Sequence, residues 1–382
     1  MQFIDINPQQ EIRNLARQFG EREVRPILEA YEQKEELPMQ LVAKMGELGF
    51  FGLIVPEEYG GVGLDYWGYA AFLEEMGRYG SIRATLTAQQ SLVCSPLIYF
   101  GSAAQKEKYL PLLASGQWLG SYCLTEPGSG SDAGAMQTRA VRDGDNWVLN
   151  GQKIFITNAT HASLFIVFAN TATDSNDRQI TAFLVEREWG VATTPLKGKL
   201  GLRASDTGTV FLQDVVVPDS NRLGEVGQGF KVALGTLDNG RISLAAAAVG
   251  TSQTCVDLTT KYIQERQQFG KPIGQFQMIQ DMLADMVVET EASRLLVHKA
   301  IVAKYSGQRF TKEASMAKYY ATEAANRNAE RALQMHGGYG FFEEYEVARL
   351  YRDARVYTIY EGTSQVQKLV ISSLQTGLKA FV

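Results

Sequence analysis

Glu361 is a carboxylate placed where the chain could aim it at a ligand. It lies in the stretch "YTIYEGTSQVQKLVISS", residues 357–373, between an aromatic run and a helical pattern. Gly362 loosens the approach to that helix, and Thr363 or Ser364 is a credible N-cap. The apolar residues that follow recur with the spacing of one helix face: Val366, Leu369, Val370 and Leu374. Such a carboxylate is either a surface loop acid or a group aimed at something, and the stretch alone leaves both readings open.

A second stretch, "YCLTEPGSGSDAGAM" (residues 122–136), is rich in glycine and small hydroxyl residues. Gly128, Gly130 and Ala133 match the dinucleotide-binding fingerprint loosely, but Pro127 interrupts it and the next segment soon becomes strand-like. A tight glycine-dependent loop is one alternative. A loop packed around a flat or anionic ligand is another, in which three hydroxyls would hydrogen-bond the ligand: Thr125, Ser129 and Ser131.

Two further stretches combine aromatic or basic side chains with turns. In "GQKIFITNA" (residues 151–159) a strand would present Phe155 and Thr157 on one face, as a core aromatic beside a surface threonine or as one wall of a ring-binding site. In "ERQQFGKPIGQFQMIQ" (residues 265–280) an arginine beside a glycine-rich turn suits a phosphate, although a solvated polar turn explains it equally. The polar residues of this second cluster are Arg266, Gln268, Lys271 and Gln277.

The histidines argue against a zinc enzyme. His161, His298 and His336 are the only three, and none stands in an HxxxH or Cys/His arrangement. His336 instead opens a Gly-Gly turn after a helical pattern. The P-loop and nucleophile-elbow signatures GxxxxGK[ST] and GxSxG are absent.

The elements that must position these residues change type twice along the chain. Residues 1–120 are typical of helices, and residues 121–231 contain short β-branched, aromatic-rich segments between turn residues, which predicts an antiparallel sheet or barrel. Helical patterns return over residues 232–382. One of them, residues 279–305, is apolar nearly all round, which predicts a helix buried on several sides. We therefore expect three packed segments, α, β and α.

The composition is that of an ordinary globular protein. The chain has 382 residues, 45% hydrophobic and 21% charged, with a net charge of −5 and no basic block, which argues against nucleic acid as a partner. No apolar run reaches the length of a membrane span. The first residues resemble neither a signal nor a transit peptide, so we expect a cytoplasmic protein. The cysteines are far apart and read as free core thiols: Cys94, Cys123 and Cys255.

Taken together these stretches resemble the acyl-CoA dehydrogenase family of flavoproteins. The likeness covers essentially the whole chain, because six motifs occur in order: "PEEYGG", "TEPGSGSD", "FITN", "RQQFGKPI", "QMHGGYG" and "IYEGTSQ". The resemblance implies an α+β fold with an N-terminal α-helical domain, a middle antiparallel β-barrel or sheet domain and a C-terminal four-helix bundle. It also implies FAD as cofactor and, most often, a homotetramer.

The resemblance also assigns cofactor residues. The flavin end would lie against Tyr122, Leu124, Thr125, Gly130, Ser131, Phe155, Ile156 and Thr157. Phe155 takes a position usually held by Trp, which puts in doubt any hydrogen bond made by the indole N–H. The pyrophosphate and adenine, partly across a subunit boundary, would be held by Arg266, Gln268, Phe269, Phe276, Gln277, Gln334, Met335, His336, Gly337, Gly338, Thr363, Ser364 and Gln365.

The same resemblance gives Glu361 the role of general base. A thioester α-C–H is a weak acid, so a positioned carboxylate and a stabilised enolate oxygen are both needed. In the family that oxygen is held by the backbone N–H of the glutamate and by a flavin hydroxyl, while a hydride leaves to the flavin. Some relatives carry the base on an earlier helix, at the position of Gly240, which has no side chain. The implied substrate contacts are Arg83, Ser131, Asp238, Arg241, Tyr360 and Gly362.

Arg83 is unusual for the segment that covers the acyl end of the pocket. An Arg there is similar to glutaryl-CoA dehydrogenases and to members acting on hydroxymalonyl groups on a carrier protein. A buried arginine needs a carboxylate partner, which a dicarboxylic acyl chain could supply. The alternative is an ion pair with Glu74 or Glu75 on the preceding helix.

We therefore expect dehydrogenation of a short acyl-CoA thioester to the 2-enoyl-CoA, with an electron-transferring flavoprotein as acceptor. A glutaryl-CoA or carrier-bound dicarboxylic substrate is the first alternative. An acyl-CoA oxidase is a second, disfavoured because oxidase chains are typically longer. A non-catalytic flavoprotein or acyl-binding scaffold on the same fold is the third.

Overall fold

The computed structural model describes residues 7–173 and 178–379. Its N-terminal part is helical, as predicted. The helices are α1 (Asn7–Phe19), α2 (Arg25–Lys34), α3 (Met39–Glu47), α4 (Tyr66–Met76), α5 (Gly80–Thr87), α6 (Ser95–Phe100) and α7 (Ala103–Ala114). Side-chain caps fix two of the starts: Asp65 accepts from the Gly68 N–H before α4, and Ser102 and Gln105 form a capping box before α7.

The middle part forms one mixed sheet. Its strands are β1 (Leu119–Cys123), β2 (Arg139–Asp143), β3 (Asn146–Thr157), β4 (Ala162–Asn170), β5 (Ile180–Glu186), β6 (Ala192–Pro195), β7 (Thr207–Pro218) and β8 (Arg222–Leu223). The order is β6-β7-β3-β2-β4-β5-β8, with β1 added to β4. The prediction of a purely antiparallel sheet is wrong at two places, because β1 and β2 pair with β4 in parallel. The described strands do not close into a barrel.

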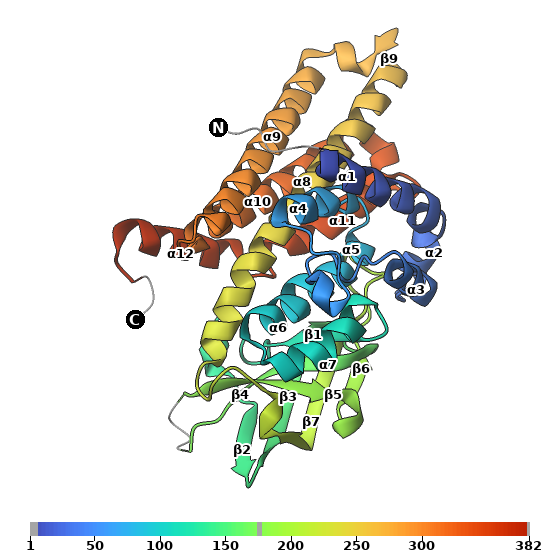
Figure 1. Ribbon diagram of the computed structural model, residues 1–382. Coiled ribbons are helices and arrows are strands. Elements are labelled where there is room, and N and C mark those ends of the chain that lie inside the picture. Colours follow the sequence, from blue (N-terminus) through green and yellow to red (C-terminus); the bar gives the residue numbers. More distant parts are fainter. Residues whose placement is uncertain (1–6, 174–177, 380–382) are drawn as a thin grey trace.

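The C-terminal part is helical again, with long helices. It contains α8 (Gly229–Glu265), α9 (Gln277–Tyr305), α10 (Thr311–His336), α11 (Glu346–Arg355) and α12 (Ser364–Thr376). Helix α10 packs against α8, α9, α11 and α12. Helix α8 runs from the sheet to the opposite end of the molecule, where β9 (Gln267–Gln268) and β10 (Lys271–Pro272) form a hairpin (Figure 1).

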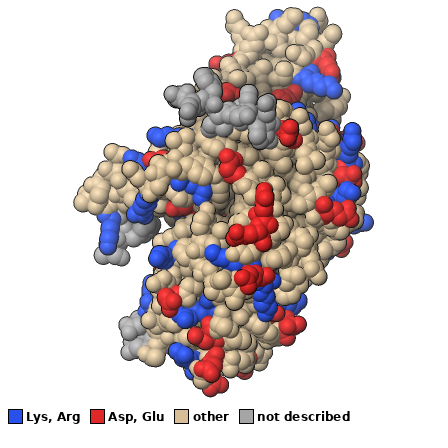
Figure 2. Space-filling view, in the orientation of Figure 1, with Lys and Arg blue, Asp and Glu red and all other residues tan. Residues whose placement is uncertain are grey.

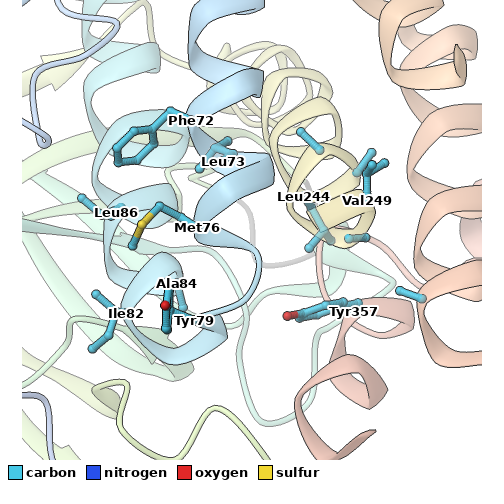
Figure 3. Packing of buried hydrophobic residues seen from close by; sticks show 14 of the residues in the cluster. Phe72, Leu73, Met76, Tyr79, Ile82, Ala84, Leu86, Leu244, Val249 and Tyr357 are labelled. Atoms are coloured by element: carbon cyan, nitrogen blue, oxygen red, sulfur yellow. The ribbon is translucent and has the colours of Figure 1, made fainter. Parts of the chain in front are cut away.

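The largest hydrophobic core joins the N-terminal and C-terminal helices. Figure 3 shows apolar side chains of α4 and α5 on one side of the view and Leu244 and Val249 of α8 on the other, with Tyr357 below, all members of this core. Two glycines let the α4 and α8 segments approach closely. A Cβ at Gly250 would lie 1.7 Å from the Glu74 carbonyl oxygen, and one at Gly77 would lie 2.2 Å from the Ala247 carbonyl oxygen. Helix α8 is therefore fixed against α4 at residues 247–250, about two to three turns after Gly240.

Two sequence predictions about burial have different outcomes. Cys94, Cys123 and Cys255 are buried free thiols, as predicted. The prediction that residues 279–305 are buried on several sides is wrong for the single chain, because Leu295 and other apolar residues of α9 are exposed.

Within the described residues, no helix combines the length and apolar character needed to cross a bilayer. The domain boundaries after residues 120 and 231 stay a prediction.

Candidate active site

Glu361 and Gly362 form a bent joint directly before α12. Both have positive φ, 57° and 86°, a conformation that is costly for glutamate and easy for glycine. Thr363 is the N-cap of α12, as the sequence allowed, and its hydroxyl accepts from the Val366 N–H at 3.2 Å. The amide of Gln367 donates to the carbonyls of residues 361 and 362 at 3.0 and 3.1 Å. These contacts hold a strained glutamate in one conformation.

The Glu361 carboxylate lies directly over the backbone of Gly240 in α8. A Cβ added at Gly240 would stand 2.7 Å from each carboxylate oxygen. The Oε2 atom is buried and has no hydrogen-bond partner, and no salt bridge joins Glu361 to any residue that the structure describes. Burial raises the pKa of Glu361 to about 7, against the opposing positive charges of Arg241, Lys318 and Arg83. The group is therefore poised to exchange a proton near neutral pH.

Two predicted substrate residues and one predicted flavin-end residue lie around this carboxylate. Arg241 is buried, forms a 2.8 Å ion pair with Asp238, and places its Nε atom 3.5 Å from the Glu361 carbonyl oxygen. Tyr122 on β1 lies within electrostatic reach, because its raised pKa is caused first by burial and then by the charge of Glu361. The site is thus built where α8, α12 and the edge of the sheet meet.

Arg83 on α5 is buried beside the same site. Its side chain donates to the Tyr360 hydroxyl at 3.1 Å and lies over the Tyr357 ring, 5.3 Å from the centroid. The two tyrosine rings stack at 6.1 Å. The Nε atom of Arg83 is buried without a hydrogen-bond partner.

The predicted alternative, a pairing of Arg83 with the α4 glutamates, is wrong. Glu74 is engaged by Arg13 at 2.8 Å and by Arg294 at 2.9 Å, and Glu75 pairs with Arg13 and Arg17 at 3.2 and 3.0 Å. Among the residues that the structure describes, no carboxylate forms a salt bridge with Arg83. Its charge faces two tyrosines instead.

The predicted flavin-end residues form an open wall beside β1. The Ile154 N–H donates to the Thr125 carbonyl at 2.9 Å, which ties the small-residue loop to β3. A register shift between Lys153 and Ile156 and a φ of 60° at Phe155 leave that ring 67% exposed. Other members of the set are also open or half-buried: Leu124, Thr125, Gly130, Ser131 and Thr157. The side chain of Ile156 points into the core, so only its backbone is available.

A buried ion pair that sequence reasoning missed anchors this wall. Lys153 is fully buried and donates to Glu126 at 2.7 Å and to the Leu124 carbonyl at 3.2 Å. Glu126 also accepts from the backbone N–H groups of Gln137 and Thr138. The only local signal was a lysine inside the strand pattern "GQKIFIT". The pair joins both ends of the glycine-rich loop to β3.

A cleft of about 570 Å³ opens at the far end of α8. It collects predicted residues of the second set: Arg266, Gln268, Met335, His336, Gly337 and Gly338. The guanidinium of Arg266 lies over the Tyr339 ring at 5.2 Å, and nothing stands within 4 Å of a Cβ built at Gly337 or Gly338. An arginine beside open glycine backbone suits a phosphate-bearing ligand.

The remaining residues of that set are exposed near the same end or lie in a second cleft. Phe269 is 92% exposed and its ring packs edge-on against Phe276 at 5.9 Å, while Gln277 and Gln334 are also exposed. A separate cleft of about 650 Å³ is lined by the start of α12: Thr363, Ser364 and Gln365.

Within one chain, the structure does not bring the predicted flavin-end residues together with the residues predicted to hold the pyrophosphate and adenine. From Gly240 to Glu265, α8 extends by about 38 Å at 1.5 Å per residue. Arg266 and the far cleft therefore lie well away from Glu361 and from the Phe155 wall. Figure 1 shows the same separation, with the β9 hairpin and the sheet at opposite ends of α8.

Family comparisons agree with this architecture. The chain matches the models described as acyl-CoA dehydrogenase N-terminal domain over residues 7–117, middle domain over residues 121–215 and C-terminal domain over residues 227–374. It is 46% identical to "Probable acyl-CoA dehydrogenase YngJ" of Bacillus subtilis, covering 97% of this chain and 99% of the relative. It is 44% identical to "Caffeyl-CoA reductase-Etf complex subunit CarC" of Acetobacterium woodii, covering 95% and 97%.

Solved structures give the same result. Butyryl-CoA dehydrogenase from Megasphaera elsdenii superposes with a TM-score of 0.95 at 41% identity, covering 98% of this chain and all of the other. A glutaryl-coenzyme A dehydrogenase solved with glutaryl-CoA superposes with a TM-score of 0.93, also at 41% identity, covering 99% and 98%. The chain therefore belongs to the acyl-CoA dehydrogenase family, whose members are FAD-dependent flavoprotein oxidoreductases.

Proposed function

We propose that the chain dehydrogenates a short acyl-CoA thioester between its α and β carbons, with Glu361 as the general base. The observation that carries this proposal is the setting of that carboxylate. It is buried, forms no salt bridge, has one oxygen without a hydrogen-bond partner, and stands over a glycine that leaves space above α8. A carboxylate that only stabilised the fold would be paired with a donor or cation.

In this mechanism Glu361 takes the α-proton of the thioester. The backbone N–H of Glu361 has no acceptor within the described residues, so it is free to hydrogen-bond the thioester oxygen as negative charge develops there. Asp238, Arg241 and Ser131 contact the CoA arm, and Tyr360 and Gly362 border the acyl group. Bound FAD supplies the hydride acceptor for the β-carbon.

The residues present fit that cofactor. Phe155 offers an exposed ring face, and Thr125 and Thr157 offer backbone and hydroxyl groups beside it, as a flat heterocycle requires. Arg266 and the open backbone at Gly337 and Gly338 suit a pyrophosphate. Because these two groups lie at opposite ends of α8, one FAD is completed by a second copy of the chain, in a closed symmetric oligomer that we propose is a tetramer.

Glu361→Gln tests the central assignment. The variant keeps the size of the side chain and the backbone N–H but cannot accept the proton. Flavin reduction by butyryl-CoA in anaerobic stopped flow should fall by roughly 10²-fold or more, the scale expected for a lost general base. FAD content and acyl-CoA binding should be unchanged. Reduction at close to the wild-type rate would mean that another carboxylate is the base.

We propose an electron-transferring flavoprotein as the electron acceptor, supported by the relative named as a subunit of an Etf complex. The reduced protein should then pass electrons to such a carrier and react slowly with oxygen. Fast peroxide formation in air would favour an oxidase instead.

A dicarboxylic acyl chain, such as glutaryl, is a second candidate because of Arg83. Its buried Nε atom lacks a partner, and no described carboxylate pairs with its charge. A substrate carboxylate reaching past Tyr360 would give the Nε atom a hydrogen-bond acceptor and the guanidinium a counter-charge. Arg83→Ala should then lose glutaryl-CoA turnover while keeping or improving butyryl-CoA turnover. Equal loss of both substrates would make Arg83 a structural partner of Tyr357 and Tyr360.

A further inference from the structure

Lys318 is a buried cation on α10 that the mechanism above does not use. Its side chain is fully buried, and its Nζ atom donates to the Gly362 carbonyl at 2.7 Å. Within the described residues it forms no salt bridge. A buried ammonium without a counter-charge is costly, so its presence needs a compensating interaction. The negative charge that acts most on it is that of the Glu361 carboxylate, one residue before the carbonyl that Lys318 holds, ahead of the charge of Glu323.

We propose that Lys318 is a positioning residue for the reaction: its ammonium group fixes the Gly362 peptide and supplies positive charge that keeps Glu361 ionised as a base. This inference rests on the proposed role of Glu361. The carboxylate sits on the joint that the ammonium holds, so the same contact sets both the direction and the protonation of the carboxylate.

The other charged groups around Glu361 serve different partners. On α8, the Arg241 charge is balanced by Asp238 at 2.8 Å. On α5, Arg83 is turned to the Tyr357 and Tyr360 rings.

Two more titratable groups face the site. On α10, Glu323 accepts a hydrogen bond from the Ser364 hydroxyl at 2.5 Å. On β1, Tyr122 is neutral at ordinary pH, because its pKa is raised. Lys318 is therefore the cation that is both held on the joint and without a salt bridge of its own.

The proton affinities of the two groups are consistent with mutual dependence. Burial lowers the pKa of Lys318 to about 8, with the Glu361 charge acting in the opposite direction. Lys318 likewise opposes the burial that raises the pKa of Glu361 to about 7. Removing the ammonium should raise the pKa of the carboxylate further. Since the carboxylate is the reactive form, the rising limb of the pH profile should then move to higher pH.

The experiment compares two neutral variants with a matched control. Lys318→Met removes the donor and the charge, whereas Lys318→Gln keeps an amide donor and removes only the charge. Gln367→Met removes an uncharged donor to the same Gly362 carbonyl and to that of Glu361. Anaerobic flavin reduction by butyryl-CoA is followed against pH in the FAD-loaded proteins. Both Lys318 variants should shift the midpoint upward by about one unit, or about tenfold in rate below it. Gln367→Met should lower the rate without moving the midpoint.

A second readout does not depend on turnover. Difference infrared spectroscopy of the loaded protein can follow the protonated carboxyl band that is lost in Glu361→Gln, and the titration midpoint of that band should shift with the kinetic one. An unchanged midpoint in both Lys318 variants, or an equal shift in Gln367→Met, overturns the inference. If Lys318→Met does not fold, Lys318→Gln gives the same decision.

The outcome for the proposed function stays separate. If Glu361→Gln reduces its flavin at the wild-type rate, the proposed base is wrong whatever Lys318 does. If that variant is inactive while the Lys318 variants keep the wild-type midpoint, only the role of Lys318 fails.

Discussion

At the scale of single residues, the site depends on an absent side chain as much as on a present one. Gly240 leaves the surface of α8 flat where the Glu361 carboxylate rests, 2.7 Å from where a Cβ would be. The αL conformation of Glu361 is what turns its side chain toward that surface. Strain of this kind persists only where surrounding contacts enforce it, here through Lys318 and Gln367.

Gly240→Ala should therefore damage catalysis more than stability. Alanine favours the helix by up to about 1 kcal/mol, but the new methyl group displaces the Glu361 carboxylate. A shift of about 1 Å in a catalytic group can cost 10²-fold, so we expect flavin reduction to fall by at least about tenfold with FAD retained. Gly235→Ala, on the same helix, is the control because its Cβ would meet only Phe100, at 3.4 Å. Equal rates for the two variants would contradict the geometry.

The pH dependence of the wild-type protein follows from Glu361. Its folded pKa is raised to about 7 by burial, and only the ionised form accepts a proton. Flavin reduction should therefore rise with pH, reach half its maximum near pH 7, and level off about one pH unit higher. The same shift has a stability cost. Because the folded protein binds this proton more tightly than the unfolded chain does, the free energy of unfolding should fall as pH rises toward 7, and it should be lowest above pH 7, where the buried carboxyl is ionised. A rate that is already constant from about pH 5 would assign the chemistry to an acid with an ordinary pKa.

At the scale of elements, the buried ion pair between Lys153 of β3 and Glu126 fixes the glycine-rich loop against β3, and this contact holds the proposed flavin wall in place. Lys153→Met would leave the Glu126 carboxylate buried with only backbone donors from residues 137 and 138. Breaking a buried pair from one side costs about 3–5 kcal/mol, so urea unfolding should show a loss on that scale together with weaker FAD retention. In the double variant Lys153→Met/Glu126→Gln, much of the lost free energy of unfolding should be restored. Additive losses in the cycle would show that the two side chains act independently.

The sequence predicted where strands form better than it predicted which strands pair. The strands β3, β5 and β7 all lie within residues 121–231, where short segments rich in β-branched and aromatic residues predicted a sheet, because strand formation is encoded in such local patterns. The parallel pairing of β1 with β4 is not encoded there, since alternation fixes which face is buried and not which strand lies beside it.

The same limit applies to the site. Glu361, its capped helix and Phe155 belong to short local patterns, and the motif resemblance named their roles. Lys318 stands 44 residues from the Gly362 carbonyl that it holds, and Lys153 stands 27 residues from Glu126. Such contacts depend on how α10 and α12, or β3 and the loop, pack in space. A lysine four residues after Ala314 and three before Ala321, on one face of α10, was the only sequence signal of the first contact.

At the scale of the whole molecule, charges of both signs alternate over the face in Figure 2, without a continuous basic surface. Helix α9 differs from that surface. Val288, Leu295 and Val302 repeat every seven residues and are 65%, 66% and 59% exposed. A seven-residue apolar repeat marks one face of a helix, and a face of this kind is usually covered by another helix. In the symmetric oligomer proposed above, a second copy of α9 would cover this face, and that burial would account for the apolar pattern of the helix.

The last prediction joins this face to the cofactor. Lys318 at the joint and Gln334 near the far cleft are separated by about 24 Å along α10, so a chain without its neighbour has only half of the proposed FAD site. Leu295→Glu places a charge in the apolar face and should yield smaller species by light scattering, with FAD lost on gel filtration. Val141→Glu, at a similarly exposed valine of β2 (59% against 66% for Leu295), should leave both properties unchanged. A Leu295→Glu monomer that keeps its FAD would refute the shared site, because one chain would then suffice to bind the cofactor.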